Sequence, residues 1–260
     1  MVKQTSPVSF YTLSHRGLVR QNNEDCALAI ALDSPDADPA LLAILADGVG
    51  GHSAGEIASR IAVDTIAAFV REHHPSPDPH VLLNDAIQAA NRAILADVSE
   101  HPERAGMGTT CACALITGHT LYAAHLGDSR IYLQREHVLQ RLTRDHTLFE
   151  EYQHLTPEST DRVGRNHPMA HVLSRYLGSA HPMHVDHHII GFENESDTLT
   201  LQSGDVLLLC SDGISDLITD EEIEGILSAC CGRKSVQVLV YRALENGGHD
   251  NATAIVLNVP

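Results

Sequence analysis

Apolar segments joined by tight turns are the feature that most restricts the fold of this chain. TTCACALITG (residues 109–118) and TLYAAHLGD (residues 120–128) are separated by a short turn around Gly118 and His119, and RIYLQREHVLQRLT (residues 130–143) has the pattern of a further hairpin. Strands connected this closely run antiparallel, because parallel neighbours need a crossover of about a dozen residues or more. We therefore expect antiparallel sheets.

Other segments extend this pattern. The further expected strands are SFYTLSHRG (9–17), CALAIALD (26–33), LLAILAD (41–47), DVLLLCSD (205–212) and ATAIVLNV (252–259). Helical periodicity predicts two long helices, from about Ala54 to Glu72 and from about Val81 to Ser99. Strands paired by short turns, with the helices in separate blocks, favour an α+β fold in layers. We see no linker or internal repeat, so we expect one domain over residues 1–260, with a mobile excursion containing short helices at 146–180.

Composition excludes several classes of protein. Apolar residues make up 43% of the 260 residues, enough for a folded core, and the net charge of −17 argues against nucleic acid as a partner. No apolar run has membrane-spanning length, and the first residues lack the apolar core of a signal peptide, so we expect a cytoplasmic enzyme. The six cysteines form no Cys-x-x-Cys pair, and none is followed six residues later by arginine. The absence of such an arginine argues against a cysteine-based phosphatase, and we expect the cysteines to be buried and reduced.

Carboxylates recur at the tips of these apolar strands. They are Glu24 and Asp25 before CALAIALD, Asp47 after LLAILA, Asp128 after LYAAHLG, Asp212 after VLLLCS, and Asp250 before ATAIVLNV. One Asp-Gly pair is an ordinary turn, but several acids at one end of a sheet repel each other unless a cation lies between them. Oxygen ligands without cysteine favour Mg²⁺ or Mn²⁺ over zinc. Two such ions could activate a water molecule for attack on a bound phosphate group.

The stretch ILADGVGGHSAGEIAS (residues 44–59) allows two chemistries. One is a metal site built on Asp47. The other is a serine nucleophile at Ser53, because residues 51–55 also read Gly-x-Ser-x-Gly. A nucleophile elbow needs the strand to lead directly into that motif, whereas residues 47–50 intervene, and the serine hypothesis leaves the other strand-tip acids unexplained. A third hypothesis is a degenerate, non-enzymatic binding module, which the presence of all these acids disfavours.

The motifs taken in order resemble a known family. They are SHRGLVRQNNED (14–25), LADGVGGHSAGEIAS (45–59), GMGTT (106–110), AAHLGDSRIY (123–132), LTRDHT (142–147), HVLSRYLG (171–178), LLLCSDGISD (207–216) and GGHDNAT (247–253). They are similar to those of the metal-dependent serine/threonine protein phosphatases of the 2C type, the PPM family, in its bacterial branch. The resemblance implies a four-layer α/β/β/α sandwich of two antiparallel sheets flanked by helices, with metal ions in a cleft at one end.

The resemblance also implies a set of metal ligands. They are Glu24, Asp47, the carbonyl group of Gly48, Asp128, Asp212 and Asp250. Asp47 would bridge two Mn²⁺ or Mg²⁺ ions, and the Gly48 carbonyl would bind one of them. Asp212 and Asp250 would complete the second ion, helped by Glu24, while Asp128 and Asp212 would hold a third, weaker one. Thr109 and Thr110 would support these ligands.

Three further residues receive catalytic roles from the resemblance. Arg20 would bind the substrate phosphate, and Asp25 would orient a metal-activated water that attacks phosphorus directly. Eukaryotic relatives place a histidine after Asp-Gly, where this chain has Val49 and, three residues later, His52. His52 is therefore expected either to protonate the leaving oxygen or only to tune bound water.

The expected substrates are proteins phosphorylated on serine or threonine by a kinase, and the expected state is a monomer with no nucleic-acid or membrane partner. Residues 146–175 match the variable flap of the family, which we expect to govern substrate choice. The histidine-rich HPMHVDHH (181–188) has no standard metal-site spacing, so we interpret it as an exposed strand or loop.

Overall fold

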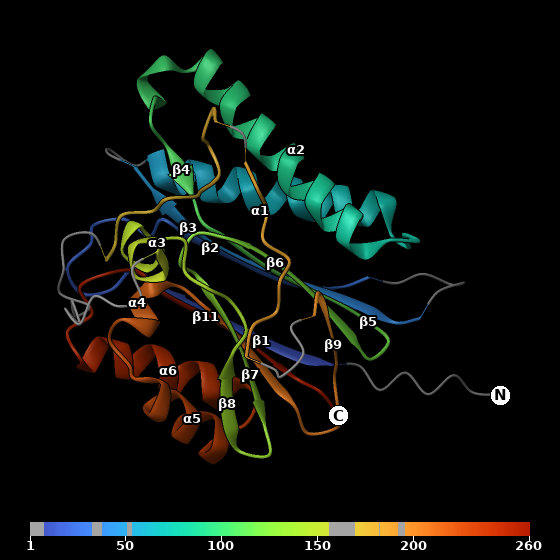
Figure 1. Cartoon of the computed structure of the whole chain (residues 1–260). Helices are drawn as coiled ribbons and strands as arrows, with labels where there is room; N and C mark the ends of the chain where they lie inside the picture. The colour runs from blue at the N-terminus through green and yellow to red at the C-terminus, as the bar shows by residue number, and fades with distance from the viewer. Residues whose placement is uncertain (1–7, 33–37, 51–53, 156–169, 182, 192–195) are drawn as a thin grey trace.

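The computed structural model describes residues 8–32, 38–50, 54–155, 170–181, 183–191 and 196–260. Two antiparallel sheets lie face to face between outer layers of helices (Figure 1). One sheet has the order β1 (Ser9–His15), β11 (Ala252–Asn258), β10 (Val206–Cys210), β7 (Arg130–Arg135), β8 (Val138–Arg141). The other has the order β2 (Asp25–Leu32), β3 (Ala40–Val49), β5 (Cys111–Thr117), β6 (Thr120–Leu126), β9 (Thr198–Thr200), with β4 (Gly108–Thr109) paired to β3. This confirms the predicted sandwich.

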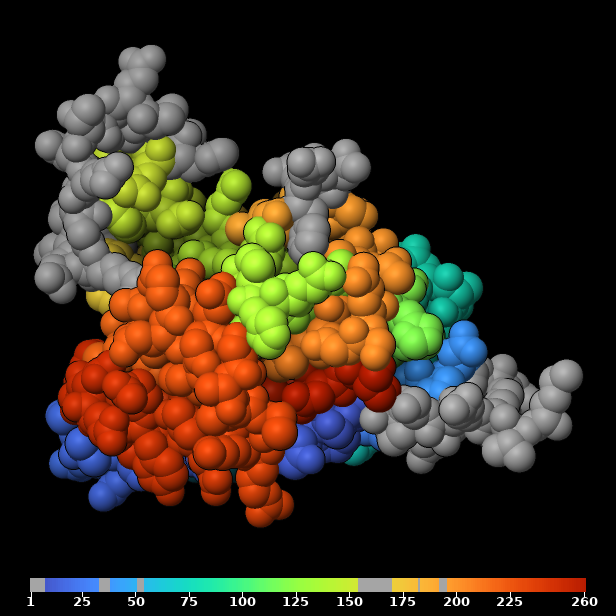
Figure 2. Space-filling view, turned by 90° about the horizontal axis from the view of Figure 1, so that it is seen from below, coloured from blue at the N-terminus to red at the C-terminus, as the bar shows by residue number. Residues whose placement is uncertain are grey.

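The helices cover both outer faces. α1 (Ala54–His73) and α2 (Pro79–Glu100) pack on the β2–β9 sheet, and α5 (Asp220–Ala229) and α6 (Arg233–Glu245) pack on the other. In Figure 2, α5 and α6, in orange and red, form much of one face, with the green β7–β8 hairpin beside them. Shorter elements are a 3₁₀ turn (Pro102–Arg104), α3 (Leu148–Leu155) and α4 (Asp212–Ser215). None of the described helices is both long and apolar enough to cross a bilayer.

Strand β3 shows why the molecule has several core layers. Successive side chains of a strand point to opposite faces of the sheet. Leu42, Ile44 and Ala46 pack toward α1 and α2, whereas Leu41, Ala43 and Leu45 pack between the two sheets. A third layer lies between β10 and β11 and the helices α5 and α6. An unbroken apolar run is therefore required of a strand that is covered on both faces.

The helix boundaries are largely those expected from local signals. α2 begins at Pro79, two residues before the expected start, because Asp78 accepts hydrogen bonds from the backbone N–H groups of His80 and Val81 and Pro79 occupies the first turn. The helices α5 and α6, at residues 220–245, were not predicted from the sequence. The signal was present, because Thr219 and Glu222 form a capping box at the start of α5.

The cysteine prediction is partly correct. Cys111 and Cys113 share a face of β5, are fully buried, and have their Sγ atoms 3.4 Å apart, and all six cysteines are free. Cys210 is also buried. Cys231, however, is exposed, because it lies between α5 and α6 rather than in a strand.

Candidate metal centre

A cleft of about 440 Å³ contains most of the acids expected from the sequence. Its lining includes Arg20, Glu24, Asp47, Gly48, Thr110, Asp128, His171, Asp212, Asp216, His249 and Asp250. Among the described lining residues, Arg20 is the one with a permanent positive charge. The arrangement therefore concentrates negative charge in a concave site, which attracts divalent cations.

Strand pairing brings the first acids together. Asp25 lies directly opposite Asp47 in the antiparallel register of β2 and β3, and the backbone N–H of Gly48 donates to the Glu24 carbonyl at 3.1 Å. Residues opposite each other in such a pair are close neighbours, and like charges there are destabilising. The register therefore holds two carboxylates close together, and a proton or a cation is needed to reduce their repulsion.

Asp47 does not end its strand, contrary to the prediction. β3 continues to Val49, because β4 takes over pairing where β5 stops, with Gly48 opposite Thr109. Thr110 bridges the change of partner. Its Oγ1 accepts from the Asp47 N–H at 2.8 Å, and its own N–H donates to the Asp47 carbonyl at 2.8 Å. Thr109 Oγ1 also donates to the Asp47 carbonyl at 2.8 Å, so both threonines fix the backbone of Asp47, as expected.

Glycine is required at position 48 by close packing. A Cβ added there would lie 2.2 Å from the carbonyl oxygen of Gly55, in the first turn of α1. A Cβ at Gly55 would in turn lie 2.8 Å from Glu24 Oε2. These two glycines let the start of α1 approach the acidic loops. The carbonyl role expected for Gly48 remains a prediction.

The described residues compensate the buried carboxylates only in part. Within the described part of the chain, Asp25 Oδ1 and Asp212 Oδ1 are buried and have no hydrogen-bond partner. Burial raises the pKa of Asp212 to about 7, and the charges of Asp250 and Asp216 act in the same direction. Burial likewise raises the pKa of Asp25 to about 6. Burial and neighbouring carboxylates raise the pKa of Asp47 and Asp128 well above the ordinary value. An all-oxygen set that resists ionisation without a counter-charge fits hard divalent cations.

Arg20 lies at the rim of the cleft. Its Nη2 donates to Asp250 Oδ2 at 2.6 Å, and 52% of its side chain is exposed. The loop that carries it is held against residues 248–250. Leu18 donates to the Gly248 carbonyl at 2.7 Å, and a Cβ at Gly17 would lie 2.2 Å from the Asp250 carbonyl oxygen. A fixed guanidinium group at this rim can meet an incoming anion.

Asn251 is a site residue that was not predicted from the sequence. Its Oδ1 accepts from the Glu24 N–H at 2.8 Å, and its Nδ2 donates to the carbonyls of Arg16 and Asn22, both at 2.9 Å. Asn251 therefore holds the loop before β2 next to Asp250. The only signal was its place directly after the acid in GGHDNAT.

Other predicted features have mixed outcomes. His52 and Ser53 lie outside the described residues, as does the 156–169 part of the expected flap. In the described part, His171 lines the cleft with Nδ1 3.2 Å from Asp216 Oδ2, which the sequence analysis did not anticipate. The 181–188 segment is a loop where described, as expected, but it is not fully exposed, because Val185 is buried.

Comparison with known proteins matches this geometry. The family described as "Protein phosphatase 2C" matches residues 18–242. The chain is 37% identical to the serine/threonine protein phosphatase PstP of Mycobacterium tuberculosis, over 100% of this chain and 46% of that protein, so it spans about half of PstP. It is 33% identical to the serine/threonine phosphatase stp of Listeria monocytogenes, over 93% of this chain and 92% of that protein.

Solved structures agree with these relatives. A crystal structure of PstP from Mycobacterium tuberculosis has a TM-score of 0.83 at 34% identity, covering 97% of this chain and 98% of that chain. A PstP catalytic domain in complex with two manganese ions has a TM-score of 0.79 at 33% identity, covering 97% and 99%. Stp1 from Staphylococcus aureus has a TM-score of 0.85 at 27% identity, covering 98% and 96%.

Proposed function

The chain belongs to the protein phosphatase 2C family, and from that premise we propose that it hydrolyses phosphoserine and phosphothreonine in proteins with the help of Mn²⁺ or Mg²⁺. The observation that carries the proposal is the cluster of buried carboxylates at the cleft, in which Asp25 Oδ1 and Asp212 Oδ1 have no hydrogen-bond partner among the described residues. The manganese-containing PstP structure, which has the same fold, supports the choice of cation.

The residues fit a centre of two cations with a third, weaker site. Those that would hold them are Glu24, Asp47, the Gly48 carbonyl, Asp128, Asp212 and Asp250. Bound divalent cations would lower the pKa of water and neutralise charge on the phosphoryl group. The buried Thr110 keeps Asp47 in place through two hydrogen bonds, so the chain presents its ligands before any ion arrives.

The protein's own groups have separate tasks in the reaction. Arg20 binds the non-bridging phosphoryl oxygens from the rim of the cleft. Asp25, anchored by a hydrogen bond of 2.9 Å from Ser211 Oγ, orients the attacking water. The water oxygen would form a bond to phosphorus as the bond from phosphorus to the serine or threonine oxygen breaks, with no phosphoenzyme. One proton of the water stays on the product phosphate, the other is released, and the leaving oxygen takes up one proton. His52 is the proposed source of that proton.

The proposal extends to the cellular setting. Substrates would be phosphoproteins produced by a serine/threonine kinase, and residues 146–175 would govern which of them bind. Residues 1–260 would act as one catalytic domain and as a monomer. The cytoplasm is the proposed location, where the six free cysteines remain reduced.

Hydrolysis assays test this function. We would strip the protein with EDTA and measure hydrolysis of para-nitrophenyl phosphate and of a phosphothreonine peptide, without cation and with Mn²⁺ or Mg²⁺. We expect activity only with a cation, and its loss in Asp212→Ala. Glu100→Gln, an exposed acid at the end of α2, is the matched control and should retain activity.

Two results would contradict the proposal. Cation-independent ester hydrolysis that a fluorophosphonate blocks would instead support Ser53 as a nucleophile. A folded sample that is inactive with every cation would support a binding module. Either outcome would mean that the chain has the fold of the family without the proposed phosphatase activity.

A further inference from the structure

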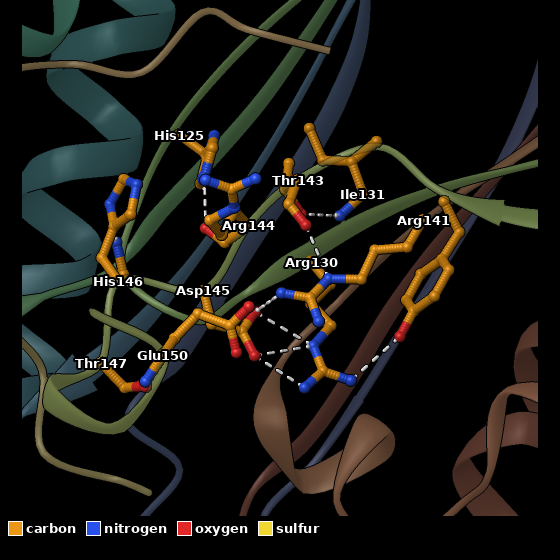
Figure 3. Close-up of polar contacts among 12 residues, drawn as sticks. His125, Arg130, Ile131, Arg141, Thr143, Arg144, Asp145, His146, Thr147 and Glu150 are labelled. Atoms are coloured by element: carbon orange, nitrogen blue, oxygen red, sulfur yellow. Dashed lines mark hydrogen bonds and ion pairs between the residues drawn. The ribbon is translucent and has the colours of Figure 1, made fainter. Parts of the chain in front are cut away.

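Residues 142–147, which follow β8, are hydrogen-bonded to residues on both sides of Asp128. Figure 3 shows the polar contacts of this segment with His125, Arg130 and Ile131. The Leu142 N–H donates to the Ile131 carbonyl at 2.8 Å, and the Ile131 N–H donates to Thr143 Oγ1 at 3.1 Å. Asp145 forms an ion pair with the buried Arg130 at 2.7 Å. This segment is therefore attached along the whole length of the turn, and it leads directly into α3.

His146 contacts Gly127, the residue that precedes Asp128. The imidazole is 1% exposed, and its Nδ1 accepts a hydrogen bond from the Gly127 N–H at 3.2 Å. The backbone N–H of His146 donates to the Gly127 carbonyl at 3.0 Å. One residue therefore engages both backbone polar groups of the glycine that precedes Asp128.

The backbone of Gly127 is also restricted by its own conformation and by Thr110. Its φ is +93°, and a Cβ there would lie 2.6 Å from Thr110 Cγ2. On the other side of Asp128, Ser129 Oγ is 2.7 Å from Thr110 Oγ1. Both neighbours of Asp128 are therefore fixed, Ser129 through Thr110 and Gly127 through His146.

Other residues hold the imidazole of His146 in place. It stacks on His125, with ring centroids 4.5 Å apart, and His125 Nε2 donates to the Arg144 carbonyl at 2.8 Å. The Ser174 N–H donates to the His146 carbonyl at 2.9 Å. Burial lowers the pKa of both rings, that of His125 to about 4, so both are neutral at pH 7. The ring therefore sits in a preformed slot with one defined orientation.

A metal ion is a poor explanation of this histidine cluster. His125, His146 and Asp186 do bring ligand atoms within 4.8 Å of one another. His146 Nδ1 already accepts a hydrogen bond, so the proton of the neutral ring is on Nε2, which lies 3.6 Å from Asp186 Oδ2. A cation at Nε2 would require a ring with no proton at all. The geometry fits a neutral His146 that accepts a hydrogen bond from Gly127 better than it fits a metal ligand.

We propose that His146 is a positioning residue for the cation ligand Asp128, acting through the hydrogen bond that its Nδ1 accepts from Gly127. The inference rests on the proposed function, because Asp128 matters only if the cleft binds cations. His146 touches neither substrate nor cation. Its task is to hold the Gly127 peptide so that the Asp128 carboxylate already faces the cleft before an ion binds.

Mn²⁺ binding measured by isothermal titration calorimetry tests the role of the Nδ1 acceptor without any turnover. His146→Leu keeps a buried apolar side chain but removes the acceptor, and should weaken the weakest Mn²⁺ site by about tenfold, as loss of a group that supports a metal ligand does. His146→Asn keeps an acceptor at the δ position and should bind like the unsubstituted chain. His146→Gln places its oxygen one bond further out and should behave like His146→Leu.

A double-mutant cycle identifies the target of the effect. Asp128→Asn should remove the weakest site, and adding His146→Leu to it should change the remaining sites no further. Equal loss in the leucine and asparagine variants, unchanged binding in His146→Leu, or a loss that persists beside Asp128→Asn would overturn the inference. If His146→Leu does not fold in EDTA, the asparagine and glutamine pair decides. Absence of Mn²⁺ binding in the unsubstituted chain would instead overturn the metal centre, and this inference with it.

Discussion

Asp212→Asn is expected to stabilise the cation-free protein while removing most of its stabilisation by Mn²⁺. Asp212 is buried, its Oδ1 has no hydrogen-bond partner among the described residues, and the charges of Asp250 and Asp216 face it. Asparagine has nearly the same shape but never acquires the charge. A carboxylate that binds a cation should thus destabilise the folded protein when the cation is absent.

The size of the effect follows from the pKa of Asp212. Burial and neighbouring charge raise it from 3.8 to about 7, so at intermediate pH the folded state keeps a proton that the unfolded state has released. The stability from this group is fully present below the unfolded pKa and is lost as the pH rises through about 7. Each pKa unit corresponds to about 1.4 kcal/mol, so the loss approaches about 4 kcal/mol at pH 8. That corresponds to a change of roughly 8–16 °C in Tm.

Thermal unfolding in EDTA between pH 5 and pH 8 measures this difference. Without cation the unsubstituted chain should lose stability as the pH rises, and Asp212→Asn should lose less. With Mn²⁺ at about 100 times its Kd, each site should return about 2.7 kcal/mol to the unsubstituted chain, which reverses the order of the two proteins. The opposite result, a cation-free Asp212→Asn protein less stable at pH 8, would refute the reasoning.

Asp205 supplies a matched control of opposite sign. It is also buried, but its carboxylate accepts from Arg135 Nε at 2.9 Å and Nη2 at 2.7 Å and from the Gln202 N–H at 2.7 Å. Asp205→Asn should therefore lower the stability of the cation-free protein at pH 8, because it breaks a satisfied ion pair. Two buried aspartates in one chain should thus respond in opposite directions to the same substitution.

Two arginines should separate catalysis from stability. Arg20→Ala should lower kcat/KM for a phosphothreonine peptide by about 10–100-fold, the value of a hydrogen bond to a charged group. It should change the free energy of unfolding by less than about 1 kcal/mol, because the Arg20–Asp250 pair is exposed; steady-state kinetics with no change in kcat/KM would contradict this role. Arg130→Met should instead lower the free energy of unfolding in urea by about 3–5 kcal/mol, since it leaves Asp145, whose side chain is 11% exposed, with one partner fewer. Undiminished stability would show that Arg141 alone satisfies Asp145.

Features set by neighbouring residues were predictable from the sequence. The hairpins followed from turns and apolar segments, and the two long helices from their periodicity. The acids could be recognised because each lies at or near the end of an apolar segment, as Asp212 lies just after β10. Such patterns need only a short window of sequence.

Features set by distant contacts were not predictable from the same patterns. Asn251 holds the loop before β2 across 229 and 235 residues of sequence, and no periodicity reports such a contact. β3 extends past Asp47 because β4, more than fifty residues later, takes over its pairing. The helices α5 and α6 were not predicted, although the capping box of Thr219 and Glu222 is a local signal for the start of α5.

The apolar core and the acidic centre are two consequences of one strand register. A slip of one residue between β2 and β3 would separate Asp25 from Asp47 and relieve their repulsion, but it would also exchange the two faces of β3. Leu42 and Ile44 would leave the layer under α1 and α2, and Leu41 and Leu45 would leave the layer between the sheets. Burial of each such side chain contributes about 1.5–3 kcal/mol, so several of them together outweigh the repulsion of one carboxylate pair. Because the core prevents the two acids from moving apart, their repulsion has to be relieved by a proton or by a cation.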